Sequence, residues 1–336
     1  MFVRFLTAAL LCATGFAPPV TAGAQYPLKL QNCGVDLTFD QAPDSAVTLG
    51  QAATEILYSL GLAEKVTATS VWFTEVLPEF RDTNAGIERL ADNDPSFESV
   101  VARKPGLVAA QYEWHVGPQG IVATREQFAD VGIPTYVLPA DCWHKDNASG
   151  SDGTRSTMFE MQSVYAGVSE LGRIFDVPER AEALVAQLQA REAAASDKAK
   201  ALNLQDASAV FWFSSAEMDV DPYVAGRKGP PGYLMAKLGL RNIVESDEEW
   251  PAISWETIAR ANPSIIVIAR MDRRRYEADD HEKKIAFLKS DPVTRQMDAV
   301  ENDRIVILDA HAMDPSIRNI AALETLAAAL PVLGLR

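Results

Sequence analysis

The sequence predicts an α/β protein of two Rossmann-like lobes with parallel sheets, joined by a single long interdomain helix. Two observations support this prediction. Short apolar runs alternate with helical patterns on both sides of residues 176–202, as in strands connected by crossover helices. Residues 176–202 themselves have the pattern of one continuous helix. We therefore expect an N-terminal lobe over 25–175, a connecting helix over 176–202 and a C-terminal lobe over 203–336.

The connecting segment has the features of a long, stiff helix. Asp176 is placed to cap its first turn, Glu179 would complete a capping box, and Pro178 is tolerated there. At 1.5 Å per residue it would extend roughly 35 to 40 Å, the width of a small domain. Its apolar residues recur at a spacing of three to four and share one face, namely Ala181, Leu184, Val185, Leu188, Ala195, Ala199 and Leu202.

Residues 1–24 have the pattern of a secretory signal peptide. Arg4 precedes an apolar stretch over 5–16, and residues 22–24 form a small-residue cleavage site. The apolar stretch is too short for a membrane span. We expect an exported protein from which this segment is cleaved; a retained membrane anchor is the alternative.

Charge and cysteine content narrow the function further. The formal net charge of -15 argues against binding to nucleic acid or to anionic membranes. Cys12 would leave with the signal peptide, and the two remaining cysteines, Cys33 and Cys142, are expected to form a disulfide in an oxidising compartment. Closing so long a loop stabilises a fold by about 4 to 5 kcal/mol. Two buried free thiols are the alternative.

The first lobe contains four short apolar runs that predict buried strands, at 46–49, 66–69, 107–110 and 135–138. Helical patterns include residues 54–57, 119–131 and 158–175, and the polar, glycine-rich stretch 146–157 predicts a loop.

The second lobe repeats this plan. Strands are predicted at 209–213, 265–269 and 304–308, and helices at 233–238, 281–290 and 317–330. Neither lobe contains a glycine-rich nucleotide-binding motif.

The two lobes share a local motif, at 95–108 and 253–266. Each copy has a serine, an aromatic residue, a glutamate, a short helix, a proline-containing turn and a buried strand. The serines are suited to helix capping, and Glu98 and Glu256 fall in the first helical turn, where the helix dipole favours acids. Helix-start chemistry alone would explain both glutamates. The stronger interpretation is that the lobes present equivalent carboxylates at equivalent surface positions.

Further motifs surround these copies: residues 52–57 (AATEIL) with 60–62 (LGL), 232–243 (GYLMAKLGLRNI) and 250–255 (WPAISW). With them the chain resembles the substrate-binding proteins of ABC importers for iron–siderophore complexes, haem and vitamin B12. The resemblance covers nearly the whole mature chain. It implies a monomeric periplasmic protein, without cofactor or catalytic activity, that delivers a small ligand to a permease and its ATPase. It also implies that Glu98 and Glu256 dock onto permease arginines, whereas we interpret Glu55 as part of a helix start.

In that family the ligand lies between the lobes, at the carboxyl ends of the parallel strands. The loops after the predicted strands supply ten candidate ligand contacts: Gln51, Trp72, Tyr112, Trp114, His115, Trp212, Tyr223, Arg227, Arg270 and Arg273. Aromatic and arginine side chains together suit a bulky anionic metal chelate, most simply an iron–siderophore complex. For each aromatic the alternative is core packing, and for the run 273–275 it is a solvated surface.

Other ligands and chemistries stay open. A corrinoid is the second candidate, and a deazaflavin precursor the third, because residues 32–34 and 211–226 resemble relatives assigned that ligand. A bare metal would require Glu113, His115, His311 and Asp314 to converge. A hydrolase would require Ser214 or Ser215 to meet His311, yet no nucleophile-elbow motif surrounds these serines.

Overall fold

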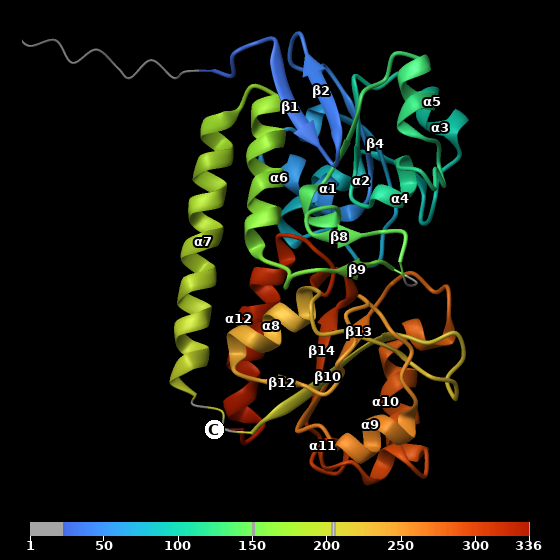
Figure 1. Ribbon diagram of the computed structural model, residues 1–336, viewed down its shortest axis with the longest axis vertical. Coiled ribbons are helices and arrows are strands. Elements are labelled where there is room, and N and C mark those ends of the chain that lie inside the picture. The colour runs from blue at the N-terminus through green and yellow to red at the C-terminus, as the bar shows by residue number, and fades with distance from the viewer. Residues whose placement is uncertain (1–22, 150–151, 203, 205, 336) are drawn as a thin grey trace, which may run out of the picture.

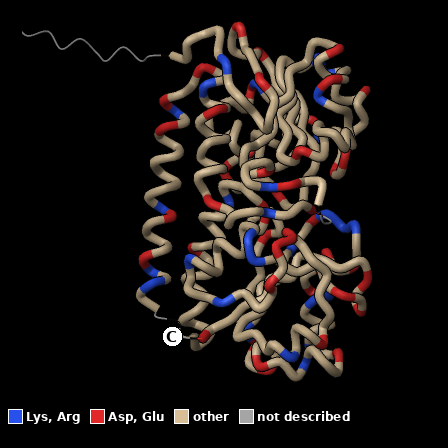
Figure 2. Tube along the Cα trace, viewed as in Figure 1, with Lys and Arg blue, Asp and Glu red and all other residues tan. Residues whose placement is uncertain are grey.

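The computed structural model describes residues 23–149, 152–202, 204 and 206–335. Most of the predicted signal peptide, residues 1–22, lies outside this part of the chain. We call the part before α7 (Pro178–Ala201) the first lobe and the part after it the second lobe. Figure 1 shows α7 extending along one side of both lobes. Lys and Arg are interspersed with Asp and Glu along the Cα trace of both lobes (Figure 2).

The first lobe is built on a parallel five-stranded sheet in the order β5-β4-β3-β6-β7. The strands are β3 (Ala46–Leu49), β4 (Val66–Ser70), β5 (Glu88–Ala91), β6 (Leu107–Ala110) and β7 (Thr135–Val137). The helices are α1 (Gln51–Ser59), α2 (Arg81–Ala85), α3 (Phe97–Val101), α4 (Glu113–Val116), α5 (Arg125–Asp130) and α6 (Met161–Ile174). An antiparallel hairpin, β1 (Leu28–Asn32) and β2 (Val35–Phe39), precedes the sheet.

The second lobe has a five-stranded sheet in which β11-β10-β13-β14 are neighbours and β12 pairs with β10. Its pairs are parallel except for the antiparallel edge between β10 and β11. The strands are β10 (Ser208–Ser214), β11 (Tyr223–Val224), β12 (Arg241–Asn242), β13 (Ile265–Arg270) and β14 (Ile305–Asp309). The helices are α8 (Pro230–Leu238), α9 (Trp255–Ala261), α10 (His281–Ser290), α11 (Asp298–Glu301) and α12 (Arg318–Val332).

The α/β fold with parallel sheets and a long helix is therefore confirmed, with corrections at element ends. Asp176 does not cap α7: its φ is 59°, and its Oδ1 accepts a hydrogen bond from the Ala24 amide at 2.6 Å. The helix predicted over 119–131 begins only at Arg125, because Thr124 and Gln127 form a capping box there. The predicted loop over 146–157 contains part of a short hairpin, β8 (Lys145–Asp146) and β9 (Thr154–Arg155).

Cys33 and Cys142 form the predicted disulfide, with their Cα atoms 5.6 Å apart. It ties the turn between β1 and β2 to the segment that follows β7. Among the described residues, no helix combines the length and apolar content of a bilayer span.

A shared hydrophobic core joins the lobes. One cluster of buried side chains contains Leu57 and Leu171 of the first lobe, Leu188 of α7, and Leu234 and Leu326 of the second lobe. Helix α7 packs against α6, α8 and α12 through a narrow stripe that includes Leu188. Because close-packed interiors resist deformation, this continuity limits the relative movement of the lobes.

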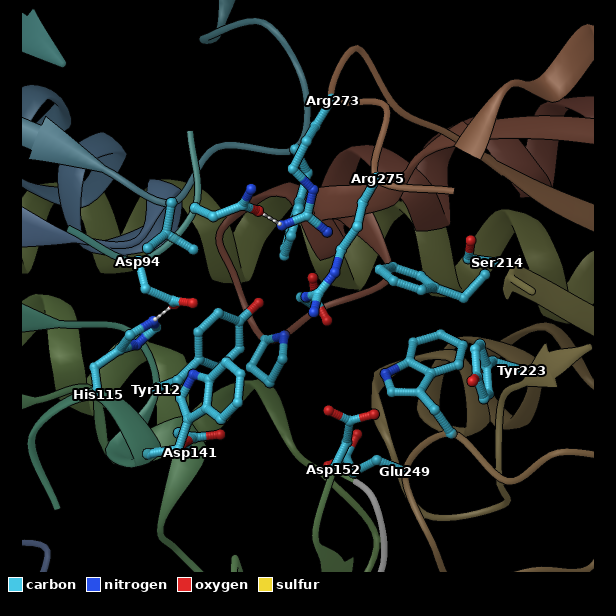
Figure 3. A pocket seen from close by; sticks show the side chains of 18 of the residues that line it. Asp94, Tyr112, His115, Asp141, Asp152, Ser214, Tyr223, Glu249, Arg273 and Arg275 are labelled. Atoms are coloured by element: carbon cyan, nitrogen blue, oxygen red, sulfur yellow. Dashed lines mark hydrogen bonds and ion pairs between the residues drawn. The ribbon is translucent and has the colours of Figure 1, made fainter. Parts of the chain in front are cut away.

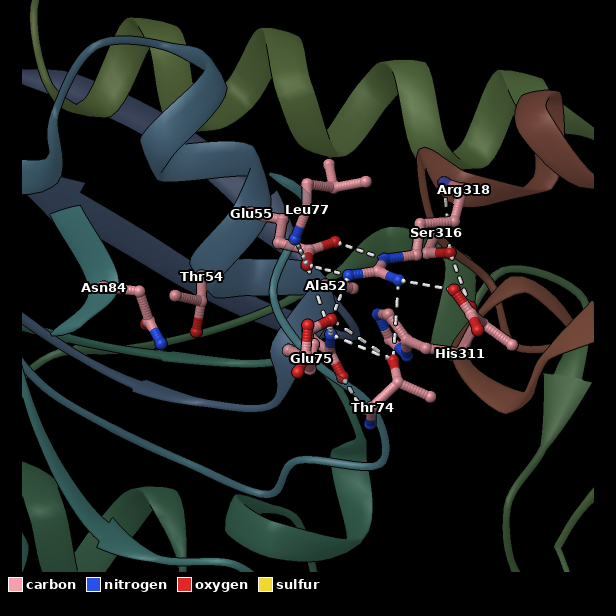
Figure 4. Close-up of polar contacts among 12 residues, drawn as sticks. Ala52, Thr54, Glu55, Thr74, Glu75, Leu77, Asn84, His311, Ser316 and Arg318 are labelled. Atoms are coloured by element: carbon pink, nitrogen blue, oxygen red, sulfur yellow. Dashed lines mark hydrogen bonds and ion pairs between the residues drawn. The ribbon is translucent and has the colours of Figure 1, made fainter. Parts of the chain in front are cut away.

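A buried ion pair also connects the lobes. Arg318, at the start of α12, donates two hydrogen bonds to the carboxylate of Glu55 on α1, the Nε–Oε2 distance being 2.8 Å (Figure 4). Its guanidinium also donates to the Glu75 carbonyl at 2.7 Å and to Asp309 Oδ2 at 3.2 Å. Both members of the pair are almost completely buried, with side chains 5% and 0% exposed. This geometry satisfies the hydrogen bonds that a buried charge requires.

We predict that Glu55→Gln will destabilise the protein by about 3 to 5 kcal/mol, because it leaves the Arg318 charge buried without its main partner. The free energy of unfolding in urea measures this effect. Glu324→Gln is the matched control, since it breaks the Arg191–Glu324 pair, whose side chains are 41% exposed, and should cost about 1 kcal/mol or less. Equal losses in the two variants would contradict a special role for the buried pair.

Candidate functional site

A cavity of about 410 Å³ lies where the carboxyl ends of strands from both sheets face each other. Tyr112 follows β6 and Asp141 follows β7 in the first lobe, whereas Arg273 follows β13 and Asp314 follows β14 in the second. The chain reverses direction after each parallel strand, which leaves these loop side chains free to face the opposite lobe. The cavity is therefore a cleft shared by the lobes.

Aromatic rings form much of its wall: Phe73, Tyr112, Trp114, Phe213, Tyr223, Trp250 and Tyr276. The Phe213 and Trp250 centroids are 4.6 Å apart, and Trp114 is 42% exposed at the edge of the cleft. Such rings offer flat, rigid contact area at a small entropic cost.

Five of the ten candidate ligand residues line this cavity: Tyr112, Trp114, His115, Tyr223 and Arg273. Figure 3 shows four of them by label, with His115 directed to Asp94. The His115 Nε2 lies 3.0 Å from Asp94 Oδ1. The Arg273 Nη1 donates to Asn93 Oδ1 at 2.9 Å, and its guanidinium lies over the Phe73 ring at 4.2 Å.

The other five do not line the cavity. Gln51 is buried beneath it, where its amide donates to Glu55 and to the Glu75 carbonyl. Trp72 and Trp212 are core residues; Trp72 donates to Thr69 and Trp212 packs on Trp255 at 4.7 Å. Arg227 pairs with Asp247, and Arg270 with Asp309. A position after a strand did not determine which way these side chains point.

Acidic side chains other than Asp314, which was considered only as a ligand of a bare metal, are the part of the site that the sequence interpretation missed. The lining contains six carboxylates, Asp94, Asp141, Asp152, Glu249, Asp279 and Asp314, against three cationic side chains, Lys145, Arg273 and Arg275. The expected cationic cleft is therefore corrected to a net acidic one. Asp94, Asp141, Asp279 and Asp314 lie on segments that follow parallel strands, and this position was the available signal. Asp152 lies between the antiparallel strands β8 and β9, and Glu249 follows the two-residue strand β12, so neither had a comparable signal.

Several of these acids have partners within the site. Lys145 Nζ lies 2.7 Å from Asp141 Oδ1, and Glu249 forms a buried ion pair with Arg155 that also connects the lobes. Hydrogen bonding to His115 lowers the pKa of Asp94. Asp279 accepts from Ser214 Oγ at 2.6 Å.

Asp314 differs from the rest. Its side chain is 6% exposed, and among the described residues its Oδ2 has no hydrogen-bond partner. Burial raises the pKa of Asp314 to about 7, although the Tyr112 hydroxyl opposes this rise. Glu249 and Asp152 raise its pKa further, whereas Lys145 lowers it. The carboxyl thus places an oxygen without a hydrogen-bond partner on the cavity wall.

The described residues of this cleft form neither the bare-metal site nor the serine–histidine pair that the sequence left open. Among the described residues no group of three or more His, Cys, Asp or Glu is arranged to hold a metal ion. His311 is buried against Phe73, and neither of its ring nitrogens has a described partner. Ser214 donates to Asp279, and Ser215 accepts from the Trp212 indole at 3.0 Å, so neither serine bonds to His311.

Comparisons with known proteins identify the family to which this chain is similar. Residues 47–312 match a family model described as periplasmic binding protein. The Bacillus subtilis uncharacterized ABC transporter substrate-binding lipoprotein YvrC is 24% identical over 72% of this chain and 69% of its own length. A vitamin B12-binding protein of Pectobacterium atrosepticum is 24% identical over 67% of this chain and 71% of its own length.

Solved structures agree with the fold. A periplasmic binding protein from Veillonella parvula has a TM-score of 0.74 at 23% identity and covers 92% of this chain and 98% of its own. An Fe³⁺-hydroxamate transport system structure from Saccharomonospora viridis has a TM-score of 0.70 at 25% identity, covering 91% and 99%. The heme-binding protein RhuT from Roseiflexus sp. RS-1 has a TM-score of 0.67 at 20% identity, covering 86% and 98%.

We predict that Asp314→Asn will remove a pH dependence of stability. A carboxyl whose pKa rises from 3.8 to about 7 on folding binds more protons folded than unfolded, so stability falls as pH rises from about 4 to about 7. At about 1.4 kcal/mol per pKa unit, the loss approaches roughly 4 kcal/mol. Urea unfolding at pH 4.5 and pH 8 should show the variant less stable or equal at the lower pH and more stable at the higher.

The exposed Asp221, outside the cavity lining, gives the matched control: Asp221→Asn should keep the parent pH profile. A parallel decline of Asp314→Asn and the parent between the two pH values would contradict the assignment.

Proposed function

We propose that this chain, which belongs to the periplasmic binding protein family, is the substrate-binding component of an ABC importer that captures a metal chelate between its lobes. The observation that carries the proposal is the aromatic-walled cavity of about 410 Å³ at the facing strand ends. Its volume lies in the range of small-molecule sites. The names of the relatives support a chelate, since they refer to vitamin B12, Fe³⁺-hydroxamate and heme.

The first candidate ligand is an iron–siderophore complex. Seven aromatic rings can cover its apolar surface, while Arg273 and Arg275 can contact the oxygen atoms around the metal. The metal belongs to the cargo and enters the cleft already chelated. A corrinoid is the second candidate, favoured by the curated relative named for vitamin B12, and a deazaflavin precursor would use the same cavity.

The lobe boundaries that we propose are 25–175 and 203–336, with residues 1–24 removed on export to the periplasm. The shared core and the two buried ion pairs between the lobes support limited closure around a largely preformed cleft. The protein would act as a monomer.

Ligand binding is testable through the indole groups at the cleft. We predict saturable quenching of tryptophan fluorescence by a ferric siderophore or a corrinoid, because Trp114 and Trp250 line the cavity. Trp114→Phe should reduce the quenching, whereas Trp255→Phe, which changes a buried ring in the core of the second lobe, should leave the ligand-induced change intact. Mass spectrometry with metal analysis of the purified protein identifies any ligand it retains. If ferric siderophores, haem, corrinoids and deazaflavins all leave the tryptophan fluorescence unchanged, the proposal is wrong.

We further propose that Glu98 and Glu256 dock onto the permease. Each is exposed in the first turn of a short helix, α3 or α9, that a serine caps. Both helices lie away from α7 in the view of Figure 1. Exposed carboxylates on a rigid pair of lobes suit a transient interface with arginines, where they contribute orientation and association rate.

We predict that Glu98→Ala with Glu256→Ala will reduce ligand uptake by at least tenfold in cells that carry the cognate importer, with ligand affinity unchanged. Glu126→Ala with Glu282→Ala is the matched control, because these exposed glutamates occupy the first turns of α5 and α10. If both double variants lose transport equally, Glu98 and Glu256 only stabilise the first turns of their helices. If ligand affinity falls as well, they contact the ligand and not the permease.

A further inference from the structure

The charges of the cavity are separated in space. Arg273 and Arg275 enter from one side, on the loop after β13, whereas Asp152 and Glu249 lie at the opposite side (Figure 3). The two arginines share their side with Asp94 and Asp279, whose carboxylates interact with them, so the cavity has an arginine-containing end and an acidic end. A purely anionic ligand would leave the acidic end without a complement.

The acidic end has more carboxylates than the protein itself neutralises. Asp141 is paired with Lys145, and Glu249 with Arg155. Asp152 and Asp314 line the same cavity, yet neither forms an ion pair within the described part of the chain. Asp152 and Asp314 are thus two carboxylates that neither Lys145 nor Arg155 neutralises.

Asp314 provides an independent indication that this end accepts a ligand group. Its carboxylate is 94% buried, by its 6% exposure, and its Oδ2 has no partner among the described residues. A buried acceptor without a hydrogen bond is costly, and a donor supplied by a ligand would remove that cost. Interaction with the Tyr112 hydroxyl opposes the rise of the Asp314 pKa without removing it.

The surrounding groups favour a charged donor over a neutral one. Glu249 and Asp152 lie close enough to Asp314 to raise its pKa, whereas Lys145 lowers it, and Asp314 also interacts electrostatically with Arg273. This negative field would stabilise a ligand ammonium. Trp250, which also lines the cavity, offers an aromatic surface for the methylene groups of an ammonium-bearing arm.

We propose that the ligand carries a positively charged amino group, which binds at the acidic end against Asp314, Glu249 and Asp152 while its metal-chelating part lies toward Arg273 and Arg275. This inference rests on the proposed function and specifies it. The cargo is then a chelate with a pendant ammonium, and the acidic end selects it over uncharged and purely anionic chelates of the same size.

Two chelates that differ in one charge test this directly. Ferrioxamine B is a ferric tris-hydroxamate with a free ammonium, and its N-acetyl derivative lacks that charge. Calorimetric titration of the full-length mature protein should give an affinity at least tenfold higher for ferrioxamine B, because a charge-assisted hydrogen bond at a desolvated site has about that effect. Asp314→Asn and, independently, Asp152→Asn should each reduce the preference at least threefold.

Asp152 is exposed, so Asp152→Asn keeps the test valid if Asp314→Asn affects folding. Asp221→Asn removes the same charge from the surface outside the cavity and should preserve the tenfold preference. This control distinguishes an effect of direct contact with the ligand from an effect of the protein's overall charge. Equal affinity of the parent protein for both chelates would overturn this inference alone. No binding of any ferric siderophore, haem or corrinoid would overturn the proposed function and this inference with it.

Discussion

The bidentate contact between Arg318 and Glu55 is the interaction on which the arrangement of the lobes depends. It joins α12 to α1 across 263 positions of sequence, in a setting where both charges are buried. Two charges taken out of water are tolerated only with closely matched hydrogen-bond partners, and here Asp309, Thr74 and the Glu75 carbonyl complete the set. Any large separation of the lobes would expose this network and break it. The pair therefore limits how far the two lobes can separate.

The second inter-lobe pair, Arg155 with Glu249, has a different consequence because Glu249 also lines the cavity. The same carboxylate stabilises the junction and contributes to the acidic end of the site. Arg155 comes from the short strand β9, in a segment whose composition predicts only a loop. The amide of Arg155 bonds to the Asp247 carbonyl, and the Glu249 amide to the Gly153 carbonyl. On this side of the cleft, Glu249 thus both holds the lobes together and forms part of the binding surface.

Much of the site could be located from the sequence, but less of its chemistry. The loops after β6 and β13 were identifiable because parallel strands of crossover units end at one edge, and Tyr112, Trp114, His115 and Arg273 do line the cavity. Trp72 and Trp212 follow the same rule of position and are core residues instead. An aromatic residue at a strand end is equally compatible with either side of the sheet. Its direction depends on the local turn and on neighbours distant in sequence.

The sequence by itself determined the alternation of strands and helices, the long α7, and the pairing of Cys33 with Cys142, since each follows from local periodicity or a count. Only the tertiary structure determined that the net charge of the cleft is negative. Asp152, Glu249 and Asp314 lie on three separate segments, and nothing in their local sequence relates them. Charges act through space, so the excess of carboxylates over Lys145 and the two arginines exists only once the lobes face each other. The physical reason is that electrostatic surroundings are a property of the fold, whereas secondary structure is largely a property of the chain.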